Sequence, residues 1–188
     1  MRQNKLGMTL LVWVLAAWVG FAVTYSSKIK KGPYMLYHGT PTEMQIMWDS
    51  DGTQDGTVDW GTSTAYNDGS SSAVHMSDNV HKCLLTGLPT DTKIFYRVNM
   101  PGGSTATSFF YSAPPENATA VTMYMGGDSR SNPNNQDLVF NRIRQDMNAQ
   151  ESVRNTMLLH SADFVATGGD ENDWQNEWFG GTTWNNTR

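Results

Sequence analysis

Apolar positions follow three different patterns in succession along the chain. A continuous apolar stretch spans residues 8–23, short alternating segments continue to about residue 113, and a strand-like run with a helical pattern follows. Alternation with a period of two predicts strands with one face in a core, whereas apolar residues three and four apart predict a helix. The expected fold is therefore mostly β, with an apolar helix at the start and a partial α/β unit at the end.

The middle part, residues 31–116, is predicted to be an antiparallel β-sandwich. In Met44-Gln45-Ile46-Met47-Trp48 every second residue is a large apolar one facing a core, and residues 92–98 repeat this alternation. Short strands that are regularly separated by turns are typical of two packed sheets. The single cysteine, Cys83, lies in an apolar run, so a buried thiol is expected rather than a reactive one.

Residues 117–188 contain the sequence Gly-Gly-Asp twice. The first copy ends at Asp128 and follows the alternating run 121–125, which reads as a buried strand. The second copy ends at Asp170 and follows the apolar run 163–167, which is expected to be the second strand. A helix is predicted between them, starting at Asn132-Pro133, because its apolar residues recur at helical spacing.

A strand–helix–strand unit makes its two strands parallel. Asp128 and Asp170 are therefore expected at the same edge of a sheet, where two carboxylates suit a hard cation. The alternative is that Gly-Gly-Asp is only a common turn composition.

These turns resemble those of the calcineurin-like metallophosphoesterases, and of purple acid phosphatases in particular. The resemblance implies that Asp128 is the first metal ligand and that Asp170 is the carboxylate bridging two metals. The family usually has a histidine at the position of Arg130, although some bacterial relatives carry arginine, so Arg130 is expected to contact substrate phosphate. The segment 80–99 resembles fibronectin type III sandwiches and, more closely, the amino-terminal domain of purple acid phosphatases, where a histidine often occupies the place of His81.

The resemblance implies that phosphate esters are hydrolysed by a dinuclear centre of iron, manganese or zinc. The later ligands of the family, which come from a Gly-Asn-His segment and from further histidines, have no counterpart here. The four histidines do not form a pair with ligand spacing, and His160 is expected to be a helix-end residue. We therefore expect the chain to be a front portion or remnant of such an enzyme, inactive alone and without a filled metal centre. Whether it is itself an enzyme stays open.

The residues after Asp170 are expected to begin another helix. Trp174 and Trp178 lie four residues apart in it, which favours packing into a core, with carbohydrate binding as the alternative.

Residues 1–27 are expected to be a secretory signal or a retained membrane anchor. Arg2 and Lys5 precede the apolar stretch, and residues 8–25 would enter the membrane if uncleaved. The expected location is therefore extracellular, periplasmic or anchored at the cell surface. A formal net charge of -5 argues against a nucleic-acid surface.

A second interpretation is a non-catalytic β-sandwich module at the cell surface or in a filament. Open strand edges and an apolar amino-terminal helix would suit self-association. The two interpretations predict different partners, a phosphate ester in the first and further copies of the chain in the second.

Overall fold

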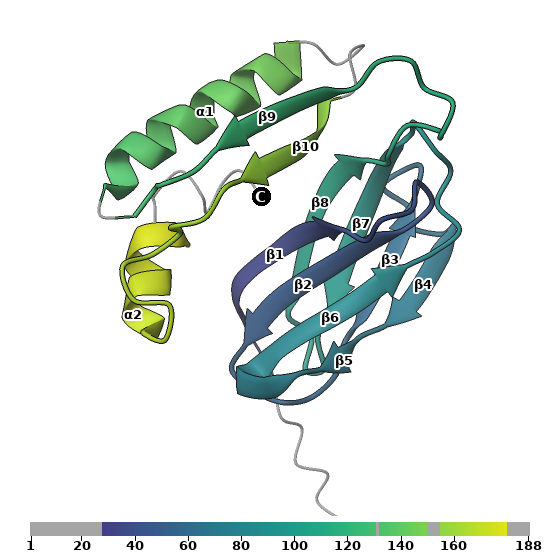
Figure 1. The fold of residues 1–188 in the computed structure, drawn as a ribbon. Coiled ribbons are helices and arrows are strands. Elements are labelled where there is room, and N and C mark those ends of the chain that lie inside the picture. The colour runs from purple at the N-terminus through teal and green to yellow at the C-terminus, as the bar shows by residue number, and fades with distance from the viewer. Residues whose placement is uncertain (1–27, 131, 150–154, 180–188) are drawn as a thin grey trace, which may run out of the picture.

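A computed structural model of the chain describes residues 28–130, 132–149 and 155–179 (Figure 1). The predicted signal or anchor, residues 1–27, lies outside these ranges. Within them, no helix is long and apolar enough to cross a membrane. The described chain forms a sandwich of two four-stranded sheets, followed by a parallel pair of strands with one long helix.

The sandwich has the strand orders β1-β2-β6-β5 and β4-β3-β7-β8, with all neighbours antiparallel. The first sheet comprises β1 (Ile29–Tyr37), β2 (Met44–Ser50), β5 (Val74–His75) and β6 (Val80–Leu85). The second comprises β3 (Thr57–Gly61), β4 (Gly69–Ser72), β7 (Lys93–Asn99) and β8 (Thr105–Tyr111). The predicted antiparallel sandwich is confirmed. Only the short strands β4 and β5 were missed, because neither shows an alternation of apolar residues.

The core of the sandwich is formed by the alternate residues that the pattern assigned to it. Ile46 and Trp48 of β2 and Tyr96 of β7 are fully buried. Each large apolar side chain buried in this way contributes roughly 1.5–3 kcal/mol to folding. Cys83 lies in the same core, and burial raises the pKa of its thiol to about 11, so the expected buried thiol is confirmed.

The second unit consists of β9 (Thr122–Gly126), the helix α1 (Pro133–Ala149) and β10 (Asn155–His160). The strands are parallel, and both this arrangement and the helix agree with the prediction. The position of the second strand was wrong, because residues 163–167 form bends rather than a strand. The backbone of Ala162 and Asp163 is left-handed, with φ of 112° and 57°, and this reversal ends the extended chain soon after β10.

The apolar face of β9 is exposed, which contradicts the prediction of a buried strand. Met123 is 50% exposed and Met125 78%, whereas Thr122 and Tyr124 on the opposite face are half-buried. Leu159, which pairs with Met125, is also exposed. The predicted alternation of β9 is therefore correct. The face that the described chain covers is, however, the one with Thr122 and Tyr124 and not the one with the methionines.

The chain continues into α2 (Glu171–Asp173) and the π-helical turn η2 (Trp174–Trp178), in agreement with the predicted helix. Lys31 of β1 is buried and donates hydrogen bonds to Asp49 (Nζ–Oδ2 3.1 Å) and to Glu171. Burial alone would lower the pKa of Lys31, but the bonds to Glu171 and Asp49 outweigh it and raise the pKa. A charged lysine therefore links the sandwich to α2, beside a contact between the rings of Tyr34 and Phe179 at 5.7 Å.

Replacing Lys31 by methionine is expected to destabilise the protein by roughly 3 kcal/mol, because it leaves the half-buried Asp49 without its cation. Since the folded pKa lies above the ordinary 10.5, this contribution is complete below pH 10.5 and disappears as the pH rises through the folded pKa. Urea unfolding at pH 7, with Lys82→Met as the control, measures the loss. Equal loss in both variants would contradict the assignment.

Candidate metal and phosphate site at the strand ends

Asp128 lies in the turn directly after β9, as predicted, and its backbone is left-handed with φ 51°. This turn is bonded to the turn that follows β10. The backbone N–H of Asp128 donates to the carbonyl of Ala162, and those of Ser129 and Arg130 both donate to the carbonyl of Asp163, each at 3.1 Å. The two turns therefore hold each other in place beyond the last paired residues of the strands.

Gly127 lies at this close approach, where a larger residue would force Ser161 to move. A Cβ at this position would lie 2.0 Å from Oγ of Ser161, which is less than any ordinary contact. The other glycines of the two Gly-Gly-Asp sequences, Gly126, Gly168 and Gly169, have open space around the same position. The two copies of the sequence are thus not structurally equivalent.

Arg130, which is predicted to contact the substrate phosphate, lies in the same turn. Its Nε is 3.2 Å from Oδ2 of Asp163, and both side chains are 47% exposed. An exposed ion pair of this kind contributes only about 0–1 kcal/mol. The guanidinium can therefore exchange Asp163 for another anion at small cost.

Asp170 does not follow β10 directly, because residues 161–169 lie between them. Its Oδ1 accepts a hydrogen bond from the backbone N–H of Asn172 at 2.8 Å and caps α2. The described residues contain no group of three His, Cys, Asp or Glu side chains that could hold a metal ion. The described chain therefore does not fit a dinuclear centre by itself, and no catalytic step is assigned to a metal here.

Ser129 and His160 join the ends of the two strands through their side chains. Oγ of Ser129 lies 3.1 Å from Nε2 of His160. The imidazole is stacked on Phe164, with ring centroids 4.2 Å apart, and meets the edge of Trp178 at 4.9 Å. Its Nδ1 is buried without a hydrogen-bond partner in the described chain, and burial lowers the pKa of His160.

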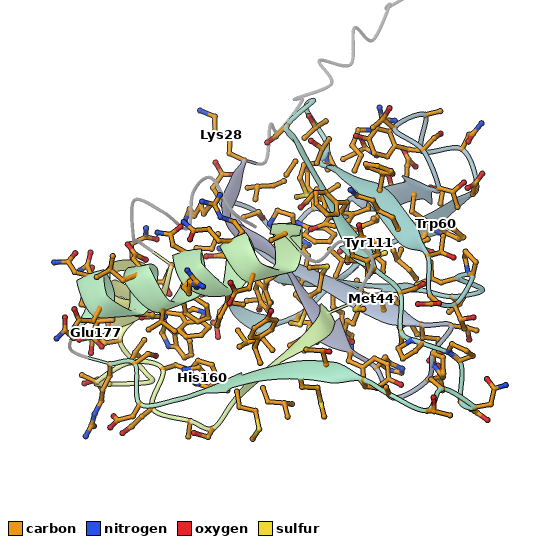
Figure 2. All side chains as sticks on the ribbon, turned by 90° about the horizontal axis from the view of Figure 1, so that it is seen from above. Lys28, Met44, Trp60, Tyr111, His160 and Glu177 are labelled. Atoms are coloured by element: carbon orange, nitrogen blue, oxygen red, sulfur yellow. The ribbon has the colours of Figure 1, made fainter. Side chains whose placement is uncertain are left out.

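The place of His160 was predicted incorrectly, since it ends β10 instead of a helix. Leu158 and Leu159 before it are a signal for the strand, but the apolar run 163–167 that follows is an equally plausible strand by composition. Figure 2 shows His160 on the side of the molecule that carries α1, away from the sandwich residue Trp60.

The aromatic residues of η2 pack inside the second unit. Trp178 contacts Phe140 of α1 at 5.8 Å and Phe164 at 4.6 Å between ring centroids. The backbone N–H of Ala166 donates to Glu177 at 2.7 Å and fastens the loop to the same turn. Trp178 is half-buried in this cluster, which agrees with the expected packing role.

The sandwich and the α/β unit together define the class of protein. It has a fibronectin type III-like domain followed by a β-α-β unit with an acidic turn. Residues 31–113 match the family model of the purple acid phosphatase N-terminal domain. The fold is similar to that of the purple acid phosphatase PPD1 from seeds of yellow lupin (Lupinus luteus), with a TM-score of 0.59 and 17% sequence identity. No curated protein sequence matches the chain.

The likeness to the lupin enzyme covers 77% of this chain and 31% of the lupin chain. The domain match at 31–113 accounts for less than half of the chain, so the likeness in fold extends beyond the sandwich. The chain spans about a third of the length of this solved relative.

Replacing His160 by phenylalanine is expected to flatten the pH dependence of stability below neutrality. The folded pKa lies below the ordinary 6.5, so the unfolded chain binds the extra proton, and wild-type stability is lost as the pH falls from 6.5 toward the folded pKa. Phenylalanine keeps the ring packing but does not titrate, while loss of the bond to Ser129 costs about 1 kcal/mol at pH 7.

The test is the urea midpoint at pH 7, 6 and 5, with the exposed His38→Gln as the control. An unchanged pH slope in the phenylalanine variant would rule out His160 as the source of the effect.

Proposed function

We propose that the chain works as part of an exported, metal-dependent phosphoesterase of the purple acid phosphatase type. The observation that carries this proposal is that the likeness in fold to a purple acid phosphatase continues past the sandwich into the β9-α1-β10 unit. In that unit the acidic turn at Asp128 stands at the carboxyl end of β9. The carboxyl ends of strands are where α/β sheets place their ligands.

In this proposal, Asp128 and Asp170 are oxygen ligands that the chain contributes to a centre of iron, manganese or zinc. Both side chains are exposed. Carboxylates are the donors that hard cations prefer. The described residues do not complete such a centre, so further ligands have to come from outside them.

Arg130 is the proposed contact to the phosphate group of the substrate. A guanidinium matches phosphate oxygens in a bidentate geometry, and its present partner Asp163 holds it only weakly. Its backbone N–H is already bonded to the carbonyl of Asp163, which fixes the start of the side chain at the strand end.

Export belongs to the proposal as well. Its support is the order of a basic head, Arg2 and Lys5, followed by the apolar stretch 8–23.

Asp170→Asn and Asp128→Asn are expected to weaken binding of Mn²⁺ or Zn²⁺ by roughly tenfold or more, because even the partners of metal ligands contribute that much. Asparagine keeps an oxygen that can cap α2, so the fold is retained. Elemental analysis after equilibration at fixed metal concentrations, with Asp173→Asn as the control, measures the difference. Metal uptake that is equal in all four proteins would exclude both ligands.

Hydrolysis of p-nitrophenyl phosphate by the same preparations completes the test. The purified chain is expected to show negligible turnover, since its described part lacks a complete metal site. Strong hydrolysis that persists in Asp170→Asn would contradict the proposed role of this residue.

A second candidate function, a self-associating surface module, is favoured by the exposed apolar face of β9. Val121, Met123 and Met125 are each at least half exposed, and they lie on one side of a sheet that has two strands in the described part of the chain. Apolar faces and open strand edges of this kind promote association between copies.

Under this second function, Met125→Lys is expected to shift the protein toward the monomer in sedimentation velocity at micromolar concentration. A charge on the associating face opposes its burial. Met35→Lys, an exposed methionine in β1 of the sandwich, is the matched control. A wild-type protein that sediments as a monomer would remove this candidate.

A further inference from the structure

A pocket of about 670 Å³ lies where the sandwich meets the turn that precedes α2. Its walls come from both units of the chain. The sandwich contributes Lys30, Asp49, Asp78 and Asn79, and the second unit contributes Gly168, Gly169, Glu171 and Trp174. The pocket therefore exists only while the two units are docked.

We propose that this pocket binds an uncharged, polyhydroxylated ligand of monosaccharide or disaccharide size, with Trp174 as the stacking surface. The inference is independent of the proposed phosphoesterase function, because neither Asp128 nor Arg130 lines the pocket.

The lining excludes an apolar ligand. It contains four ionisable side chains, one amide, two glycines and one indole, and no aliphatic side chain. Carboxylates accept hydrogen bonds, the Lys30 ammonium donates them, and the Asn79 amide does both. Sugar hydroxyls also do both, so they can satisfy every group of this lining. The volume lies within the range of small-molecule sites, about 300–1,000 Å³.

Charge distinguishes between the remaining polar ligands. Lys31 donates hydrogen bonds to Asp49 and Glu171 and offsets one of their two negative charges. Lys30 offsets the charge of Asp78 on the lining, so one negative charge remains at the pocket. A phosphate group would meet three carboxylates with one lysine on the lining. A metal ion would find no group of three ligands in the described chain. A neutral ligand avoids both penalties.

Trp174 has a fixed orientation in the pocket wall. Its indole N–H donates to the carbonyl of Gly168 at 2.7 Å. The ring packs against Phe164 and Phe179, with centroids 6.1 and 6.2 Å away. An indole that is held by these contacts and lines the pocket offers a preorganised apolar surface for the C–H face of a pyranose.

The sandwich wall of the pocket includes two consecutive residues with left-handed backbone. Asp78 and Asn79 have φ of 58° and 63°. Aspartate and asparagine tolerate this region better than other non-glycine residues.

Saturation-transfer NMR and tryptophan fluorescence on the purified chain test the proposal. The probes are methyl α-D-glucopyranoside, methyl α-D-mannopyranoside, N-acetylglucosamine, cellobiose and lactose. At least one is expected to bind with a millimolar Kd, and Trp174→Ala is expected to weaken it about tenfold through loss of stacking. Asp78→Gly is the second test variant, for use if Trp174→Ala does not fold. Glycine keeps the left-handed backbone and removes one hydrogen-bond acceptor from the pocket.

Glu116→Gln, an exposed acid outside the pocket, and Asp128→Asn are expected to bind the same probe unchanged. The proposal is overturned if no probe binds, or if Trp174→Ala and Asp78→Gly both bind like the wild type. It is also overturned if orthophosphate or Mn²⁺ displaces the sugar at these residues. Failure of sugar binding leaves the metal measurements on Asp128 and Asp170 unaffected, so the two hypotheses fail separately.

Discussion

The apolar core between the two sandwich sheets is the interaction on which the rest of the structure depends. Trp48, Tyr96 and their neighbours are fully buried there, whereas Val165 is the only buried hydrophobic side chain beyond residue 113 in the described part of the chain. A unit with so little burial of its own cannot offset the entropy of ordering its backbone. The β9-α1-β10 unit therefore relies on its aromatic cluster for its own packing, and on the ion pairs of Lys31 and the Tyr34–Phe179 contact to hold it against the sandwich.

This dependence explains why the two candidate sites differ in character. The turns at Asp128 and Arg130 are organised locally, by backbone hydrogen bonds to the turn after β10, and stay open to solvent. The pocket at Trp174 is organised by docking, since its two walls belong to different units. A change at Lys31 thus acts on the pocket directly and on the acidic turns only through overall stability.

The exposed face of β9 is the point at which the enzyme and assembly interpretations separate. A strand with Met123 and Met125 on its open side needs cover, and either further polypeptide or a second copy of the chain would supply it. The relation of residues 31–113 to purple acid phosphatases favours cover by further polypeptide. In physical terms, the same surface would suit a second copy of the chain equally well.

Local patterns were sufficient for the sandwich strands other than β4 and β5, for α1 and for the turn at Asp128, because each depends on residues only a few positions apart. The sequence alone could not decide which face of β9 is covered, since alternation defines two faces without saying what packs on them. Nor could it choose residues 155–160 over 163–167 as the second strand, because the choice depends on how the turn at Ala162 bonds to the turn at Asp128. The bond between Lys31 and Glu171 joins residues 140 positions apart. Only the tertiary structure could bring them together, because no local preference acts over such a separation.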